Sequence, residues 1–331
     1  MVAVLVWGSG YGQAQAADSH SSSAADAYTQ AILTASAQVR ETVYDNYFTY
    51  FTADELRLMM DDYQGSFGGV GITMLVNDKE QVLISGVYQD GPAAAAGVLP
   101  GDIILAVDGV SLGKVADANV AALKIRGEIS TEVTLTLQRE TVGNIDLTMV
   151  RDTVSAVSVK GELLPQLPGL AYIRISDFAE NTADEFMEEY NRLLEDGAIK
   201  ALIFDLRSNT GGSFYAALRI ANYFIVNNGL IVTEKMGDKE QPYLSSSGVL
   251  ANLPIVVLQN GYTASASEVL AGAIADYGHT VLVGSNSYGK GITQSLEPLP
   301  SGNGLRYTRG KYLTPSGFSL HGSGLKPDIL V

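Results

Sequence analysis

The hydrophobic pattern divides the first half of the chain into a helical beginning and a β-rich continuation. Between residues 25 and about 64, apolar side chains recur with helical periodicity and glycine and proline are absent, which predicts helix. Glycines within residues 65–69 end this pattern. Short apolar runs then alternate with turn residues as far as residue 150, which is typical of a small β-rich domain. The predicted strands are 71–76, 81–87, 103–107, 133–137 and 145–150.

The second half of the chain alternates strand-like and helix-like segments. Short, strongly apolar runs predict strands, and the amphipathic stretches between them predict helices. This order implies βαβ crossovers and a largely parallel sheet. We therefore expect an α/β core, together with the β-rich domain and an N-terminal helical segment. The predicted strands are 171–175, 201–206, 255–258 and 280–283, and the predicted helices are 183–195, 214–226 and 265–277.

Residues 1–27 differ in composition from the rest of the chain. Residues 1–7 are apolar, and the sequence Ala14-Gln15-Ala16 has the small-x-small form of a signal-peptidase site, but no basic region precedes it. We therefore expect either a disordered tail or a signal or membrane-anchor segment that is truncated at its start. No other stretch has the roughly 20 apolar residues of a membrane helix. The expected segments are 1–27, this tail or anchor; 28–65, a helical segment packed on the core; 66–152, the β-rich domain; and 153–331, the α/β core.

The composition limits the available chemistry. The 21 lysine and arginine residues against 36 aspartate and glutamate residues give a net charge of −15, which argues against nucleic acid or an anionic membrane as the main partner. The absence of cysteine excludes thiol nucleophiles, disulfides and cysteine-based zinc sites. The three histidines, His20, His279 and His321, leave few places for a histidine-based triad or metal site. We expect neither a metal nor a cofactor.

A glycine-rich turn at residues 68–71 opens the β-rich domain. Successive N–H groups in such a turn can bind a carboxylate, and a strand edge beside it can accept an extended peptide. Taken alone, the glycines are more typical of a tight turn. In the same domain, Arg126 could meet a carboxylate, brace the domain against its neighbour or lie solvated on the surface.

Three segments of the second half carry candidate chemistry, and each also has an ordinary or competing explanation. Ser265 and Glu268 fit a helix capping box. Residues 284–290 fit the G-x-x-x-x-G-K form of a P-loop, and residues 202–205 imitate the strand that ends in a magnesium-binding aspartate. However, Gly291 stands where a P-loop needs a hydroxyl, and the aspartate precedes the lysine. A P-loop nucleotidase therefore stays a remote alternative.

Together the segments supply a nucleophile, a base and backbone donors for peptide hydrolysis. No G-x-S-x-G motif occurs, so a triad of the α/β-hydrolase type is not expected. Lysine can replace histidine as the base in serine enzymes, provided that burial lowers its pKa from about 10.4 towards neutrality. Lys290 lies between two glycines and follows an apolar run, so we expect its side chain to be buried.

Several motifs give the chain a family resemblance. GPAAAAGVLPGDIILAVDG (91–109) resembles a PDZ domain in the permuted form found in bacterial proteases. TASASE (263–268), YGKGITQ (288–294), LIFDLRSNTGG (202–212) and YLTPSG (312–317) resemble the C-terminal processing peptidases, or tail-specific proteases. The resemblance extends from about residue 40 to the C-terminus.

The resemblance assigns catalytic roles. It implies that Ser265 is the nucleophile, that Lys290 is its general base, and that Gln294, one helical turn's count after Lys290, orients the amine. It also implies that the N–H groups of Gly212 and Ala266 form the oxyanion hole, with Gly211 the less favoured candidate.

The PDZ-like motif assigns peptide-binding roles. It implies that Gly69, Val70, Gly71 and Ile72 bind the terminal carboxylate of a substrate, and it leaves Arg126 as a candidate regulatory residue.

Neighbouring residues compete for some of these roles. Ser267 is an alternative nucleophile by residue type, but the 25-residue spacing to Lys290 favours Ser265. We expect Glu268 to cap the helix rather than act as an acid, and His279 and His321 to have structural or surface roles.

The implied function is that of a bacterial-type, extracytoplasmic serine endopeptidase that reads C-terminal tails and cleaves through an acyl-enzyme. Its expected partners are protein or peptide substrates, with no nucleic acid, and further expectations are a membrane anchor in the N-terminal segment and a homodimer or an adaptor protein. The alternative is a PDZ scaffold that binds tails without cleaving them. The presence of both Ser265 and Lys290 argues against that scaffold.

Overall fold

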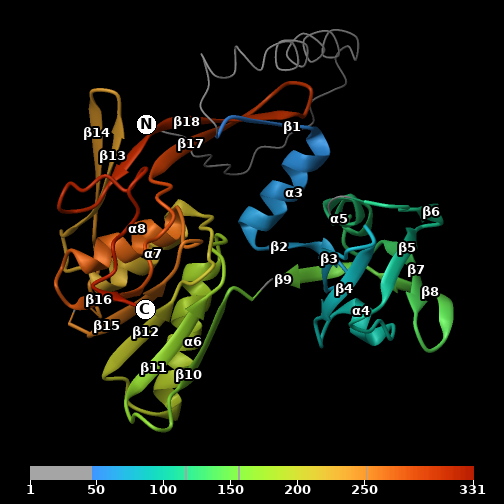
Figure 1. The fold of residues 1–331 in the computed structure, drawn as a ribbon, viewed down its shortest axis with the longest axis horizontal. Helices are drawn as coiled ribbons and strands as arrows, with labels where there is room; N and C mark the ends of the chain where they lie inside the picture. Colours follow the sequence, from blue (N-terminus) through green and yellow to red (C-terminus); the bar gives the residue numbers. More distant parts are fainter. Residues whose placement is uncertain (1–46, 116–117, 156, 251) are drawn as a thin grey trace. The chain divides into compact units, whose positions relative to one another are not determined.

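The computed structural model describes residues 47–331 except 116–117, 156 and 251 (Figure 1). The signal-like segment and the first half of the expected N-terminal helical segment, residues 28–46, therefore lie outside the described residues. The chain divides into two compact units. The small unit comprises Arg57–Ala156, and the large unit comprises the residues up to Leu56 together with Val157–Val331.

A six-stranded sheet organises the large unit. Strands β11, β12, β15, β16 and β19 run parallel to one another in that order, and β10 joins the edge beside β11 in antiparallel orientation. The α/β core with a largely parallel sheet is thus confirmed. The strands are β10 (Val159–Leu163), β11 (Leu170–Ile175), β12 (Ala201–Asp205), β15 (Ile255–Gln259), β16 (Thr280–Gly284) and β19 (Ile329–Leu330).

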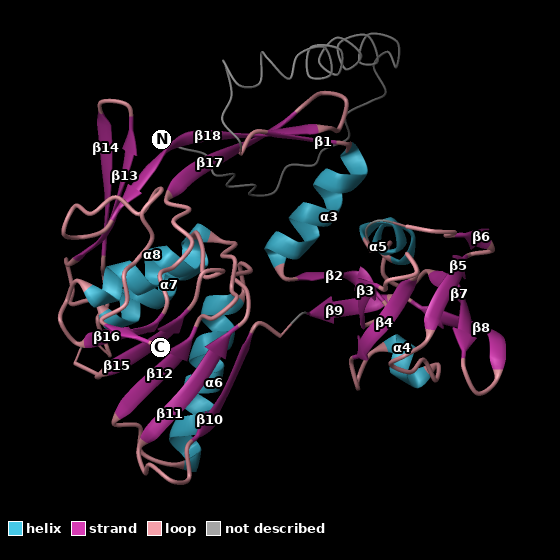
Figure 2. Cartoon of the chain, in the orientation of Figure 1, coloured by secondary structure: helices cyan, strands magenta, loops and turns pink. Residues whose placement is uncertain are grey.

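Three helices pack on one face of this sheet (Figure 2). They are α6 (Thr182–Asp196), α7 (Phe214–Phe224) and α8 (Ala266–Ala275). Alternate strand residues such as Ile173, Phe204 and Val257 are fully buried against them, because successive side chains of a strand point to opposite faces. The loops that follow β12, β15 and β16 carry Gly212, Ser265 and Lys290, respectively.

A second, antiparallel sheet in the large unit was not predicted. It contains β1 (Thr49–Phe51), β13 (Leu230–Met236), β14 (Lys239–Leu244), β17 (Ile292–Pro298) and β18 (Gly304–Leu313). The continuous helix expected over residues 25–64 is wrong at Thr49–Phe51, which pair with β18. Helix α3 (Ala53–Gln64) begins only after Thr52, because Thr52 and Glu55 form a reciprocal cap through each other's backbone N–H groups.

The small unit is β-rich, as expected. Its main sheet has the order β3-β4-β5-β7-β8, with β6 beside β5, and β2 pairs separately with β9. Alternate side chains of these strands form its core with α5. The elements are β2 (Ser66–Gly69), β3 (Ile72–Val76), β4 (Val82–Val87), α4 (Pro92–Ala95), β5 (Ile103–Val107), β6 (Val110–Ser111), α5 (Asn119–Ile125), β7 (Glu132–Arg139), β8 (Gly143–Val150) and β9 (Asp152–Ser155).

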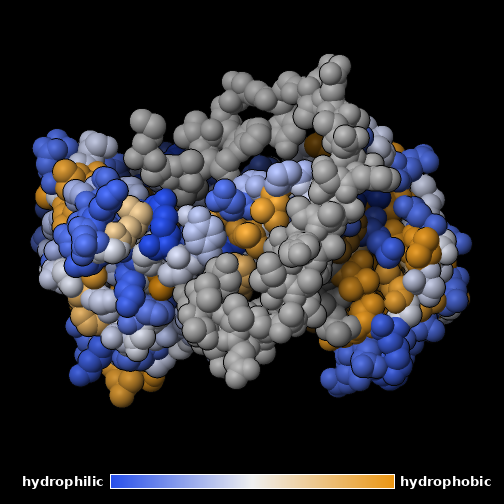
Figure 3. Space-filling model, turned by 90° about the horizontal axis from the view of Figure 1, so that it is seen from above, coloured by the Kyte–Doolittle hydropathy of each residue, from blue (hydrophilic) through white to orange (hydrophobic). Residues whose placement is uncertain are grey.

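One face of the molecule shows both polar and apolar residues. On the face drawn in Figure 3, hydrophilic residues predominate and hydrophobic residues show in smaller groups. No helix in the described ranges is long and apolar enough to cross a membrane. Across the same ranges, no three histidine or acidic side chains gather in a way that would hold a metal ion.

Candidate active site

Ser265 lies at the junction between β15 and α8. Its φ of +57° falls in the left-handed region that non-glycine residues seldom adopt. The buried Thr263 anchors the preceding turn by donating its hydroxyl to Leu206 O at 2.8 Å. Ala264 N–H donates to Asn209 O at 3.0 Å. The nucleophile candidate is therefore fixed against the loop between β12 and α7.

Lys290 lies in the loop 285–291, with glycine on each side. A Cβ atom on Gly289 would lie 2.9 Å from a backbone nitrogen of the segment 320–324, and one on Gly291 would lie 2.5 Å from another. Any side chain at these positions would push that segment away, so only glycine allows so close an approach. The close approach of Gly289 and Gly291 thereby holds the backbone at Lys290 against the segment 320–324.

The carboxylate of Glu268 joins the loops of the two catalytic candidates. Its Oε2 accepts the Ser265 N–H at 2.9 Å and the Lys290 N–H at 2.8 Å. Its Oε1 accepts the Gly289 N–H at 2.7 Å and the Ser287 hydroxyl. Glu268 is fully buried, and hydrogen bonds to a charged acceptor are stronger than neutral ones. The expected cap on Ser265 is present, and the same oxygen also holds Lys290.

The amine of Lys290 lies in half-buried, positively charged surroundings. Burial lowers the pKa of Lys290 below that of an ordinary lysine, and the guanidinium of Arg306 lowers it further. Nζ also lies 5.6 Å from the ring centroid of Tyr47. Burial and the Arg306 charge favour the neutral amine, which is the form that a general base requires, whereas the Tyr47 ring favours the ammonium form.

Gln294 belongs to β17, so the helical count from Lys290 does not describe the local structure. Its amide nitrogen donates to Tyr47 O at 3.2 Å. This bond leaves Oε1 as the acceptor of the side chain. The expected bond from Lys290 to Gln294 stays a prediction.

Gly211 lies against Ser265, and Gly212 lies against Phe178. Both have positive φ, at +103° and +130°, and a Cβ atom on Gly211 would lie 2.7 Å from Ser265 Cβ. The Gly211 N–H donates to Asn209 Oδ1 at 2.9 Å. Among residues 47–331, with the gaps given above, the Gly212 N–H has no acceptor. The Ala266 N–H belongs to the first turn of α8, where the helix supplies no acceptor. These two N–H groups remain the candidates for an oxyanion hole.

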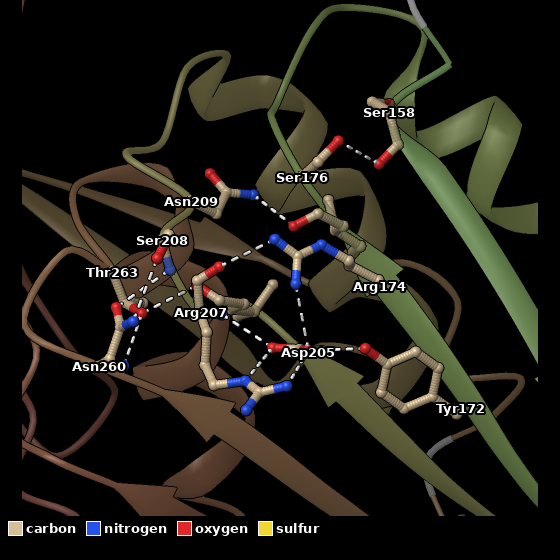
Figure 4. A network of polar contacts seen from close by, with 12 residues as sticks. Ser158, Tyr172, Arg174, Ser176, Asp205, Arg207, Ser208, Asn209, Asn260 and Thr263 are labelled. Carbon is tan, nitrogen blue, oxygen red and sulfur yellow. Dashed lines mark hydrogen bonds and ion pairs between the residues drawn. The ribbon is translucent and has the colours of Figure 1, made fainter. Parts of the chain in front are cut away.

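A polar network fixes the end of β12, just before the glycine pair (Figure 4). The buried Asp205 carboxylate accepts the Tyr172 hydroxyl at 2.6 Å and two donors of the Arg207 guanidinium at 2.8 and 2.7 Å. Arg174 Nη1 lies 3.4 Å from the same carboxylate. Burial alone would raise the pKa of Asp205, but the bonds from Arg207 and Tyr172 lower it to about 2. The carboxylate therefore stays ionised and holds the start of the loop 206–213.

The competing side chains have contacts that limit their roles. Ser267 is fully buried and donates its hydroxyl to Asn209 O at 3.1 Å, which leaves it unsuited to attack a substrate. His279 accepts a backbone N–H of β15 through its carbonyl. The ring of His321 lies 6.0 Å from that of Tyr47 in an edge-on arrangement.

The loop of Lys290 is not a P-loop. A P-loop leads into a helix and points its backbone N–H groups at phosphate. Here the loop leads into strand β17, and the N–H groups of Gly289 and Lys290 donate to Glu268. The structure therefore excludes the nucleotidase alternative.

The glycine-rich turn of the small unit connects β2 to β3. Gly69 pairs within β2 opposite Asp152, Gly71 turns with φ +78°, and Ile72 begins β3. Val70 is 1% exposed, and its carbonyl accepts an N–H from α4 at 2.8 Å. Gly69 is thus a strand residue, and Val70 contributes its side chain to the core.

Arg126 is not solvated, so the surface interpretation is wrong. Its side chain is 14% exposed and lies 3.7 Å above the centroid of the Phe67 ring. Nη2 donates to Asp62 Oδ1 at 2.6 Å, and Nη1 donates to Leu58 O at 3.4 Å. All these groups belong to the small unit, where Arg126 braces the second part of α3.

Asn209, Arg306 and Tyr47 were not singled out from the sequence. A polar residue in a glycine-rich loop directly after a buried strand was the available signal for Asn209. Tyr47 comes from a segment far from Lys290 in sequence, and Arg306 lies on β18, in the antiparallel sheet that was not predicted.

Comparisons with known proteins identify two domain families in the chain. Residues 169–331 match the model of peptidase family S41, and residues 83–139 match a PDZ domain. The carboxy-terminal-processing protease of Bartonella bacilliformis is 34% identical over 295 residues, which cover 87% of this chain and 66% of that protein. A CtpA-like serine protease of Staphylococcus haemolyticus is 34% identical over 291 residues, which cover 87% of this chain and 57% of that protein. The chain thus spans less than two thirds of the length of these relatives.

Two solved structures share the fold. A photosystem II D1 C-terminal processing protease aligns with a TM-score of 0.52 and 26% identity, covering 87% of this chain and 78% of the other. An S41 protease from Bacteroides fragilis NCTC 9343 aligns with a TM-score of 0.54 and 19% identity, covering 91% of this chain and 82% of the other.

Proposed function

Since the chain carries a PDZ domain and a peptidase family S41 domain, we propose that it is a serine endopeptidase that cleaves proteins recognised by their C-terminal tails. The observation that carries the proposal is the Glu268 carboxylate. One of its oxygens holds both Ser265 and Lys290 by their backbone N–H groups. The shared acceptor brings the two backbones close together, which supports a pairing of the Ser265 hydroxyl with the Lys290 amine, and burial and Arg306 lower the pKa of that amine.

The first half of the proposed reaction forms an acyl-enzyme. Ser265 Oγ attacks the scissile carbonyl carbon while the neutral Lys290 amine takes the hydroxyl proton. The N–H groups of Gly212 and Ala266 stabilise the developing oxyanion. The tetrahedral intermediate then collapses, the C–N bond breaks, and the Lys290 ammonium protonates the leaving amine. Gln294 Oε1 orients the lysine amine in this proposal.

The second half of the reaction hydrolyses the acyl-enzyme. Lys290 takes a proton from water, and the oxygen of that water attacks the ester carbonyl. The same two N–H groups stabilise the second oxyanion. Collapse breaks the bond to Ser265 Oγ, which regains a proton from Lys290. The cycle needs no further group to carry charge or protons.

The small unit supplies tail recognition in this proposal. The turn of residues 69–72 binds the free carboxylate, and an edge beside it accepts the extended tail. Gly71 supports this role, because its φ of +78° gives a turn that lets successive N–H groups converge. We also place the chain outside the cytoplasm, and we keep a membrane anchor in residues 1–27 and a homodimer or adaptor protein as parts of the proposal.

The proposal is tested with an unfolded protein that ends in an apolar tail. Cleavage is measured for the wild type, Ser265→Ala and Lys290→Ala, with the tail carboxylate free or amidated. We expect each substitution to lower kcat by about 10⁴-fold or more, since the members of such a catalytic unit act together. Amidation should raise KM for the wild type. Ser111→Ala and Lys239→Ala, at exposed positions, serve as matched controls.

Two outcomes contradict the proposal in different ways. Undiminished cleavage by Ser265→Ala would show that another residue is the nucleophile. A folded wild type that binds the free tail but does not cleave it would favour the scaffold alternative.

A further inference from the structure

Asn209 is a polar residue with no exposed surface, in the loop between β12 and α7. Both ends of its side-chain amide are used. Oδ1 accepts the Gly211 N–H at 2.9 Å. Nδ2 donates to Ile175 O at 2.8 Å, and this bond is the dashed line at the Asn209 side chain in Figure 4. Because Ile175 is the last residue of β11, the Asn209 side chain connects the glycine pair to the carboxyl end of that strand.

The hydrogen bond between the Asn209 side chain and the Gly211 N–H decides which N–H of the glycine pair remains without an acceptor. Phe178 donates its N–H to Gly211 O at 3.0 Å and accepts the N–H of Ser213 through its carbonyl. The Gly211 N–H donates to Asn209, and the two hydrogen bonds of Phe178 go to Gly211 and Ser213. None of these bonds uses the Gly212 N–H. In the described residues the Gly212 N–H is thus the one N–H of the glycine pair with no acceptor.

The backbone carbonyl of Asn209 holds the other side of the site. It accepts the Ala264 N–H at 3.0 Å and the Ser267 hydroxyl at 3.1 Å. These two residues bracket Ser265 and Ala266 in the chain. One buried residue therefore fixes both the turn that carries the Gly212 N–H and the turn that carries the Ala266 N–H.

We propose that Asn209 is the positioning residue of the oxyanion hole: its side-chain amide occupies the Gly211 N–H, and its carbonyl sets the first turn of α8, so that the N–H groups of Gly212 and Ala266 converge. Asn209 itself touches no substrate. The inference rests on the proposed function, in which these two N–H groups stabilise the oxyanion.

A positioning role differs from a purely structural one in what it affects. Misplaced donors weaken binding of the tetrahedral state and leave ground-state peptide binding unchanged, so kcat falls while KM stays the same. A purely structural role lowers the melting temperature and lowers activity only as far as the protein unfolds.

The test compares Asn209→Ala and Asn209→Asp with the wild type. Aspartate keeps an acceptor for the Gly211 N–H but turns a second oxygen towards Ile175 O, so it should destabilise the fold at least as much as alanine. Asn222→Ala is the matched control, because Asn222 also accepts several hydrogen bonds through its side chain, from Ser245 and Ser246, away from the site. Melting temperature, kcat, KM and the Ki of a peptide aldehyde are measured for each.

We expect Asn209→Ala to lower kcat about 10²-fold, the lower end of the cost of removing an oxyanion donor. KM should change less than threefold, and the aldehyde, which forms a tetrahedral adduct, should bind more weakly by a similar factor to the loss in kcat. Asn209→Asp should retain more activity than Asn209→Ala in spite of an equal or lower melting temperature. Asn222→Ala should lower the melting temperature and leave kcat unchanged.

Activity that follows melting temperature across the three variants would overturn the inference, as would full aldehyde affinity in folded Asn209→Ala. Either result leaves the proposed function intact. If the wild type neither cleaves a peptide nor binds the aldehyde, or if Ser265→Ala still cleaves, the proposed function fails and the inference fails with it.

Discussion

At the scale of the residue, the proposed chemistry depends on keeping one lysine neutral. Transfer of a lysine from water to a half-buried site penalises the ammonium form, and a nearby fixed cation adds to the penalty. Lys290 has both, because Arg306 faces the same site and carries a permanent charge. Arg306 itself is half-buried, donates to Thr49 Oγ1 at 3.3 Å and lies 5.2 Å from the ring centroid of Phe51.

Replacing Arg306 should therefore change the pH dependence of the reaction. Loss of the positive charge in Arg306→Met removes a cause that lowers the pKa of Lys290, so that pKa rises towards the ordinary lysine value. The acid limb of the profile of kcat/KM against pH should move to higher pH. Arg306→Lys keeps the charge and should move the limb less. An acid limb that stays in place in Arg306→Met would show that burial alone sets the pKa.

At the scale of the element, a buried ion pair holds two strands of the small unit together. Asp102 precedes β5, and its carboxylate accepts hydrogen bonds from Nε and Nη2 of Arg139 on β7, at 2.8 and 2.7 Å. It also accepts a hydrogen bond from the Leu99 N–H at 2.9 Å. The Asp102 side chain is 2% exposed. Burial by itself would raise the pKa of Asp102, but the bonds from Arg139 and Leu99 outweigh it and lower the pKa.

Breaking this pair should destabilise the small unit. Arg139→Met leaves a buried carboxylate without its cation, which costs about 3 kcal/mol at pH 7. Because the folded-state pKa of Asp102 is lowered, the stability from the pair is present above the unfolded pKa of about 4 and is lost as pH falls below it. The difference between wild type and variant should therefore shrink in acid. Hydrogen exchange of the β5 and β7 amides measures it.

A surface pair of the same kind is the control for this prediction. Arg192 bonds Glu189 and Asp196 on α6, but its side chain is 51% exposed. Arg192→Met should cost less than about 1 kcal/mol, because solvent screens exposed ion pairs. An equal cost for the two substitutions would argue against burial as the reason for the larger effect at Arg139.

The elements also show what sequence reasoning could and could not supply. The strands at Ile103–Val107 and Ala201–Asp205 were found to within a residue, since buried apolar runs between turn residues are a local signal. Thr49–Phe51 were assigned to a helix, because the partner strand that makes them β1 lies about 250 residues further along. Glu268 was recognised as a cap from its spacing to Ser265, but its hold on Lys290 depends on how β16 and α8 pack.

At the scale of the whole molecule, the net charge of −15 should influence which substrates arrive fastest. A field of one sign raises the association rate of oppositely charged ligands, and salt screens it over about 8 Å at physiological ionic strength. The chain should therefore cleave an unfolded substrate with basic flanks faster than one of equal length with acidic flanks. The ratio of the two kcat/KM values should fall towards one as salt is raised. A ratio that does not depend on salt would contradict this.

The order of the pairing partners along the chain has a consequence for folding. The pairing of β1 with β18 brings Thr49 beside Arg306 and closes one of the longest loops in the described part of the chain. Closing long loops is slow. The pairing of β2 with β9 sets Ser66 opposite Ser155, so that the inserted residues leave and return at adjacent points. Once β2 and β9 have paired, the ends of the inserted residues lie next to each other. The loop that the two segments of the large unit must still close is then shorter. The inserted unit, which closes through neighbouring hairpins, is thus suited to fold first and to speed the assembly of the large unit.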